Sequence, residues 1–262
     1  MSNQPARTHW KIMCDVIFAL IIRELKTRFG TTRLGYFWAL AEPVAQVAIM
    51  GLIFTLLGRT SIAGIPVALF LFSAILPFKL FGKLLPQLSQ AVNANKGLLS
   101  YRQVNAIDPV IARVIIEVIN FLLVYLVVFG FMGWLGFDVI PHDLLELLAA
   151  SGLLAITAVG LGLMLCSAVT YWKDTDKVVA MVMQPMFFVS GIFFCAPMIP
   201  PQYWYLFDWN PIFHAIELSR DAFFEHYRTP VGSFEYLGLW ALFCFCGGLA
   251  VFHHNRMRFL TA

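Results

Sequence analysis

Charged residues are scarce in this sequence of 262 residues. Asp, Glu, Lys and Arg make up 13% of it, apolar residues make up 60%, and the mean hydropathy is +0.78. A soluble globular chain carries ~25% charged residues, because water has to hydrate its surface. The scarcity of charge excludes a soluble domain, and the apolar content excludes a disordered chain. We therefore expect an integral membrane protein.

Cysteine is also scarce, and the common catalytic motifs are incomplete. Five cysteines are too few for a disulfide scaffold, and a net charge of +3 is too small to indicate nucleic acid binding. The only Gly-Lys pair, Gly82-Lys83, lacks the first glycine and the hydroxyl residue of a nucleotide-binding phosphate loop. Cys244 and Cys246 would point in different directions on a helix, which disfavours a zinc site. We expect no catalytic residue, metal or cofactor in this chain.

Six stretches between charges are long enough to cross a bilayer. A helix rises ~1.5 Å per residue, so about 20 apolar residues cross a hydrocarbon core of ~30 Å. Because backbone groups in lipid must be hydrogen-bonded within their own segment, we predict an all-α membrane protein with six transmembrane helices. Pro197 and the prolines that follow it should end the fifth helix near Cys195. The predicted spans are about 36–57, 65–88, 110–136, 147–171, 178–195 and 235–253.

The distribution of lysine and arginine predicts the orientation of these spans. The segments expected on one side carry 13 of these residues, and those expected on the other side carry only Arg59, Arg220 and Arg228. Cytoplasmic segments of membrane proteins are enriched in lysine and arginine. We therefore predict that both termini are cytoplasmic. The cytoplasmic segments would be 1–36, 89–113, 172–177 and 254–262.

The N-terminal region contains an apolar run that is too short to cross a membrane. This run, residues 16–22, is followed by Arg23, Glu24, Lys26 and Arg28, and no small-residue cleavage site appears. We expect no cleaved signal peptide. Residues 10–29 instead predict an amphipathic helix that lies in the membrane interface.

The cytoplasmic segment 86–108 is polar enough to leave the membrane. One interpretation is a solvated loop that joins two spans, and the other is a docking helix for a cytoplasmic partner. Leu98, Leu99 and Tyr101 favour docking, because a loop that is merely in water would not need them. Asp108 followed by Pro109 predicts the start of the next helix.

The outer segment 196–212 is rich in proline and aromatic residues, and Asn210-Pro211 then predicts a helix start. In the following segment, 211–227, we expect an apolar face opposite Glu217, Asp221 and Glu225. One interpretation of the whole region is an interfacial aromatic belt. The other is a re-entrant pair that covers an exit between the fifth and sixth helices.

Several ionisable residues fall inside the predicted spans. A charge at the centre of a membrane helix costs ~2.5–3.5 kcal/mol on insertion scales, so each suggests a functional site. Lys79 and Lys83 are four residues apart and share one face of a helix. They either meet water or an anion, or extend toward the cytoplasm. Polar positions on the neighbouring spans favour a functional role or interhelical pairing: Glu42, Gln46, Glu117 and Asn120.

Residues 23–43 (RELKTRFGTTRLGYFWALAEP) resemble the first-span signature of type-2 ATP-binding-cassette (ABC) exporter permeases, a basic interfacial helix followed by Leu-Gly-x-x-Trp and Pro. Three further stretches resemble the permease of Kps-type capsular polysaccharide exporters of Gram-negative bacteria. These are NKGLLSYRQVNAIDPVIAR (95–113), IPPQYWYLFDWNP (199–211) and HAIELSRDAF (214–223). The resemblance extends over nearly the whole chain, with the motifs in the expected order.

This resemblance implies a homodimer in the inner membrane, in which each copy docks one cytoplasmic ATPase subunit. ATP and Mg²⁺ would bind that partner. Segment 89–105 would be the coupling helix, spans one and five would line a channel, and 197–227 would form the outer gate. The cargo would be an acidic, lipid-linked polysaccharide that passes to a periplasmic co-polymerase or adaptor and an outer-membrane export protein. The implied ATPase contacts are Asn95, Lys96, Gly97, Leu98, Leu99, Tyr101 and Arg102.

The path of such a cargo needs flat apolar faces for sugar rings and cations for phosphate or carboxylate groups. The aromatic candidates are Trp38, Tyr203 and Trp204. The charged candidates near the inner entrance are Arg28, Arg33, Glu42, Lys79 and Lys83. Two alternatives to a capsule exporter are a permease for another lipid-linked glycan, such as O-antigen or teichoic acid, and an intramembrane enzyme. The enzyme would need a nucleophile and a base at membrane depth, and the sequence offers neither.

Overall fold

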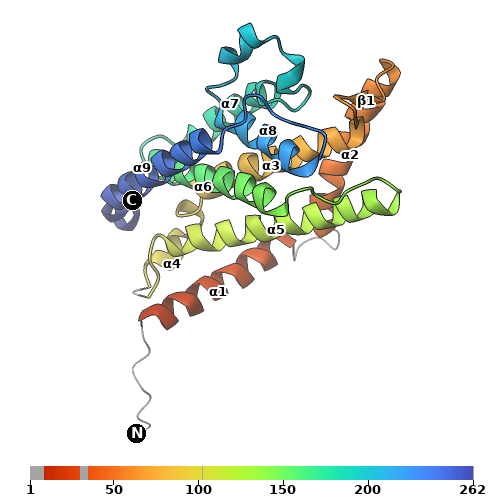
Figure 1. The fold of residues 1–262 in the computed structure, drawn as a ribbon. Helices are drawn as coiled ribbons and strands as arrows, with labels where there is room; N and C mark the ends of the chain where they lie inside the picture. Colours follow the sequence, from red (N-terminus) through yellow and green to blue (C-terminus); the bar gives the residue numbers. More distant parts are fainter. Residues whose placement is uncertain (1–8, 30–34, 102, 262) are drawn as a thin grey trace.

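The computed structural model describes residues 9–29, 35–101 and 103–261, and this part of the chain is mostly helical (Figure 1). Two short strands, β1 (Ser61–Ile62) and β2 (Ile65–Pro66), form an antiparallel hairpin between the second and third helices. Short 3-10 helices occur at η1 (Asn93–Asn95), η2 (Ala196–Met198) and η3 (Pro201–Leu206). The α-helices are α1 (His9–Phe29), α2 (Gly35–Leu56), α3 (Val67–Ser89), α4 (Lys96–Leu99), α5 (Asp108–Trp134), α6 (Leu144–Val169), α7 (Thr175–Val189), α8 (Pro211–Phe223) and α9 (Phe234–Thr261).

Four of the helices in the described residues, α3, α5, α6 and α9, are long and apolar enough to cross a membrane. They correspond to the predicted second, third, fourth and sixth spans. Helix α2 lies where the first span is predicted, and it is apolar along the stretch Ala41–Leu56. The number six therefore stays a prediction, whereas a helical membrane protein is what these four helices indicate.

The predicted end of the fifth span is wrong. Helix α7 stops at Val189 rather than near Cys195, and its 15 residues extend about 22 Å, less than a hydrocarbon core of ~30 Å. The chain turns at Gly191, whose φ is +78°. A side chain there would also lie 2.7 Å from the ring of Phe213, so the turn depends on glycine. This turn, and not the prolines that follow, ends the helix.

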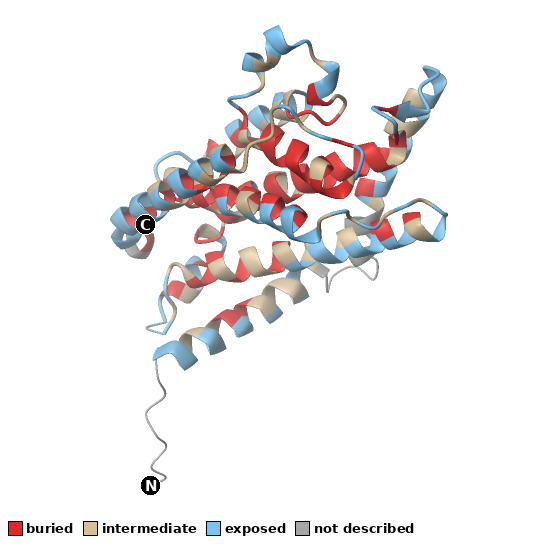
Figure 2. Ribbon diagram, in the orientation of Figure 1, coloured by how far each residue is buried: buried red, intermediate tan, exposed pale blue. Residues whose placement is uncertain are grey.

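Helix α3 lies at the centre of the bundle and is buried along almost its whole length (Figure 2). It packs against α2, α5, α6 and α8. Helices α6 and α9 approach most closely at two glycines. A Cβ atom on Gly160 would lie 2.3 Å from the backbone of Cys244, and one on Gly248 would lie 2.3 Å from the carbonyl oxygen of Gly160. Backbone-to-backbone packing of this kind is typical of membrane helices with small residues at their interface.

Helix α1 lies beside the first half of α5 and runs in the same direction (Figure 1). Ile17 and Leu20 pack against Ala112, and further along both helices Glu24 pairs with Arg113 and Arg28 with Glu117. The amphipathic character predicted for residues 10–29 is explained by this contact. Its position in the plane of a membrane interface stays a prediction.

Helix α8 is packed inside the bundle, where it contacts α3, α6 and α9. Glu217 was expected opposite the apolar face of this segment, and its side chain is nevertheless completely buried. Asp221 is partly buried and Glu225 is exposed. The charge of Glu217 is tolerated inside because Arg220, one turn further along α8, lies 3.2 Å from its carboxylate.

Candidate functional site

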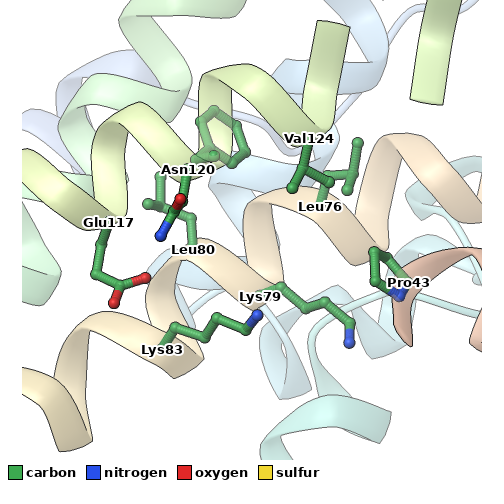
Figure 3. Close-up of a pocket in the computed structure, with 9 residues that line it drawn as sticks. Pro43, Leu76, Lys79, Leu80, Lys83, Glu117, Asn120 and Val124 are labelled. Atoms are coloured by element: carbon green, nitrogen blue, oxygen red, sulfur yellow. The ribbon is translucent and has the colours of Figure 1, made fainter. Parts of the chain in front are cut away.

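The two lysines inside the predicted second span line a small cavity between α2, α3 and α5. The cavity has a volume of about 50 Å³ and is bordered by Pro43, Lys79, Lys83, Glu117 and Asn120 together with apolar side chains. Figure 3 shows the lysines on neighbouring turns of α3, with Glu117 and Asn120 extending from α5. The four-residue spacing read from the sequence therefore does place both ammonium groups beside one cavity.

Glu42 is the anion that the two lysines share. The Nζ atom of Lys79 lies 2.7 Å from one Glu42 oxygen, and the Nζ atom of Lys83 lies 3.6 Å from the other. Because Glu42 belongs to α2, this is an interhelical pair, one of the alternatives that the sequence left open. The Lys79 side chain is 16% exposed, whereas those of Lys83 and Glu42 are 44% and 59% exposed. One face of this ionic cluster is therefore open.

Arg28 joins a second ionic cluster to the same cavity. Its guanidinium group pairs with Glu117, which lines the cavity, and donates to the side-chain oxygen of Gln87. Arg28 also contacts Glu24 on its own helix at 3.1 Å, and Arg113 of α5 lies 3.3 Å from the same Glu24 oxygen. Each of these side chains is at most 20% exposed. Charges of opposite sign on α1 and α5, together with the hydrogen bonds of Arg28 and Arg113 to Gln87 of α3, fix the position of α1 against α3 and α5.

The two clusters together carry more positive than negative charge. They contain the cations Arg28, Lys79, Lys83 and Arg113 and the carboxylates Glu24, Glu42 and Glu117. The half-exposed Lys83, at 3.6 Å from its carboxylate, is the most loosely paired of these cations. Ammonium groups at the edge of an apolar cavity bind phosphate and carboxylate oxygens strongly, because little water competes there.

The aromatic residues proposed for the cargo path lie elsewhere on the molecule. Trp38 is 64% exposed on the outer surface of α2, beside Phe37. Tyr203 and Trp204 lie on η3, where Tyr203 is 47% exposed and the indole of Trp204 donates to the carbonyl of Ile199 at 2.9 Å. The structure does not bring these aromatic side chains to the lysine cavity. Arg33 lies outside the described residues.

The segment predicted to couple to an ATPase is divided into an inner and an outer face. Asn95 and Leu99 are buried, whereas Lys96, Gly97 and Tyr101 are exposed. Leu98 is half-buried against the cluster formed by α1 and α5. The helical part is short, one turn of η1 followed by the four residues of α4. Arg102 lies outside the described residues.

The most deeply buried ionic group in the described chain was not predicted. The Arg220 guanidinium is completely buried, lies over the ring of Phe70 at 3.8 Å, and donates to the carbonyls of Ile192 and Phe194. Its partner Glu217 accepts from the hydroxyl of Tyr227 at 2.6 Å. Burial, and next the negative charge of Glu217, raise the pKa of Tyr227 far above its usual range, so this hydroxyl stays protonated and donates.

Glu217 also accepts hydrogen bonds from two other segments of the chain. It accepts from the backbone N–H of Ala196 at 3.3 Å and from the Thr229 hydroxyl at 3.1 Å. The i, i+3 spacing of Glu217 and Arg220 is a sequence signal that could have predicted an ion pair along one helix. The partners of this pair on segments 192–196 and 227–229 could not be predicted, because no local pattern indicates a contact between distant segments.

Long apolar helices around a central buried helix, with ionic pairs inside the bundle, define a polytopic helical membrane protein. The model of the ABC-2 type transporter family matches residues 15–224 of the chain. The chain therefore belongs to the ABC-2 type transporter family.

Curated relatives extend this similarity to almost the full length of the chain. It is 33% identical over 257 residues, 98% of the chain and 100% of the relative, to the polysialic acid transport protein KpsM of Escherichia coli. It is 28% identical to the capsule polysaccharide export inner-membrane protein CtrC of Neisseria meningitidis, over 90% of the chain and 89% of that protein. A third relative is the O-antigen export system permease protein RfbA of Klebsiella pneumoniae, at 24% identity over 94% of the chain and 93% of that protein.

Proposed function

We propose that this protein is the permease subunit of an ATP-driven exporter that moves a lipid-linked acidic capsular polysaccharide across the bacterial inner membrane. The observation that carries the proposal is the similarity to a polysialic acid transport protein along 98% of the chain. Polysialic acid carries one carboxylate on each sugar unit. The excess of cations beside the cavity between α2, α3 and α5 suits a cargo of that charge.

In this proposal the chain supplies the path and a partner supplies the energy. Two copies of the chain would form the channel, each with one cytoplasmic ATPase subunit docked on the exposed face of Lys96, Gly97 and Tyr101. The ATPase would hold ATP and Mg²⁺. Segment 197–227 would control the outer exit, and the cargo would pass to a periplasmic co-polymerase or adaptor and an outer-membrane export protein.

The lysine cavity would act by exchange of anions. In the structure the single carboxylate of Glu42 pairs with both Lys79 and Lys83 and so balances only one of their two positive charges. A phosphate or sugar carboxylate that reaches the open side of the cluster competes with Glu42 for the looser of the two lysines. Because Glu42 stays nearby, it can pair with the lysine again and displace the anion. The cargo is therefore bound reversibly and is not trapped.

The test is the double substitution Lys79→Ala with Lys83→Ala. We expect surface polysaccharide to fall roughly tenfold or more, since each charge-assisted hydrogen bond to an anion contributes about 1.5–3 kcal/mol. Finished polymer should accumulate inside the cell, and the protein should still copurify with its ATPase. The measurement is the ratio of intracellular to surface polymer in cells that carry only the variant.

The matched control is Lys173→Ala with Lys177→Ala, a second pair of lysines four residues apart that are both exposed. This control should leave export unchanged. Normal surface polymer from the Lys79 and Lys83 variant would indicate that these lysines have a purely structural role. Normal surface polymer from cells that lack the whole chain would contradict the proposed function itself.

A permease for another lipid-linked glycan is the second candidate. It is favoured by the similarity to an O-antigen export permease, which covers 94% of the chain. The chemical structure of the repeating unit in the glycolipid that copurifies with the protein separates the two candidates.

A further inference from the structure

The end of α3 is held against the start of α7 by one carboxylate. Asp176, in the first turn of α7, accepts a hydrogen bond from the Ser89 hydroxyl at 2.6 Å and a second from the side-chain amide of Gln90. Ser89 is completely buried and Asp176 is partly buried. The two bonds use both carboxylate oxygens, so the contact is directional as well as strong.

This contact lies at the beginning of the segment that would receive force from the ATPase. Residues 89 and 90 are followed directly by η1 and α4, which carry the exposed residues Lys96 and Gly97. Asn95 ties the same segment to the body of the bundle, because it donates to the carbonyl of Ala91 at 2.7 Å and accepts from the Arg23 guanidinium of α1. A displacement of α4 is therefore passed on to the neighbours of this segment.

The other end of α7 is held by α8. Asn210, the residue before α8, donates from its side chain to the Ser190 hydroxyl at 3.1 Å, just after α7 ends. Arg220 of α8 donates to the carbonyls of Ile192 and Phe194. Helix α7 thus extends about 22 Å, contains Pro185, and has side-chain hydrogen bonds at both ends.

We propose that Asp176 is a positioning residue for transport, which makes α7 follow the movement of segment 89–105 and carries that movement to α8. The inference rests on the proposed function, because it assumes an ATPase that acts on this segment. Coupling between two sites requires an element whose arrangement both sites bias. Helix α7 meets this requirement only while the contact of Asp176 with Ser89 and Gln90 is intact.

The experiment compares Asp176→Ala with the wild-type permease–ATPase complex in membrane vesicles, measuring ATP hydrolysis and polymer export in the same preparation. We expect export to fall roughly tenfold, within the usual range of a coupling free energy, while ATP hydrolysis stays within about twofold. Asp176→Asn keeps an acceptor oxygen for Ser89, so it should restore at least about half of the export. Asp174→Ala, an exposed carboxylate two residues earlier, is the matched control and should export normally.

A second variant keeps the inference testable if Asp176→Ala does not assemble. Ser89→Ala with Gln90→Ala removes both donors and should uncouple hydrolysis from export in the same way. Unchanged export in either variant would overturn the inference, and so would a parallel loss of hydrolysis and export, which indicates a merely structural role. A wild-type complex that exports no polymer would instead contradict the proposed function.

Discussion

The buried ion pair of Arg220 and Glu217 shows how much of the packing in the described bundle depends on single side chains. Its guanidinium joins α8 to the turn after α7, and Glu217 joins α8 to segment 227–229. Desolvation makes such a pair costly to bury, so its contribution lies in fixing one arrangement of three segments rather than in raw stability.

Removing one member of this pair should destabilise the protein strongly. For Arg220→Met we expect a loss of about 3–5 kcal/mol, because Glu217 stays buried without a counter-charge. The combined substitution Arg220→Met with Glu217→Gln should recover part of that loss. Thermal unfolding in detergent, followed by the fluorescence of the tryptophans, measures both.

Arg228→Met is the control for this prediction. It removes an ion pair with Asp221 in which Arg228 is 69% exposed, so its cost should be within about 1 kcal/mol. If Arg220→Met were no more destabilising than Arg228→Met, the buried pair would not hold these segments together.

At the scale of the helices, the glycines between α6 and α9 set the distance between two of the four long apolar helices. Gly160→Ala should destabilise the protein by about 1–3 kcal/mol, because the new Cβ atom would lie 2.3 Å from the backbone of Cys244. A backbone cannot move aside as a flexible side chain can. The measurement is the midpoint of thermal unfolding of the purified protein.

Gly152→Ala on the same helix is the matched control, since a Cβ atom at Gly152 would meet nothing within 4 Å. This substitution should be neutral or stabilising by up to about 1 kcal/mol, because alanine favours a helix. The opposite signs separate packing from helix propensity. Equal effects of the two substitutions would contradict close packing of α6 on α9.

The helices could be predicted from the sequence where length and apolar content suffice, as for α3, α5, α6 and α9. The end of α7 could not, because Gly191 ends it through a positive φ and a close contact with Phe213, which is distant in sequence. The lysine pair was predicted from its four-residue spacing. The roles of Glu24, Arg113 and Asp176 as partners were missed, since their contacts join segments 86 to 89 residues apart.

For the molecule as a whole, the segments before and after α3 lie at opposite ends of the bundle. The β1–β2 hairpin precedes α3, the η1–α4 segment follows it, and the two lie at opposite ends of the bundle, with the end of α9 near α4 (Figure 1). The excess of lysine and arginine in segments 1–36, 89–113 and 254–262 predicts that the α4 end faces the cytoplasm. The hairpin would then face the periplasm.

Labelling of single cysteines tests this orientation. In a background in which the exposed Cys14 and Cys246 are replaced by serine, a membrane-impermeant maleimide should label Ser61→Cys in intact spheroplasts and Ser100→Cys only after permeabilisation. Both positions are exposed, so accessibility to water does not distinguish them and only the side of the membrane does. If Ser100→Cys reacted from outside, the ATPase-facing segment would be on the wrong side for a cytoplasmic partner, and the proposed path of energy through α4 and α7 would be excluded.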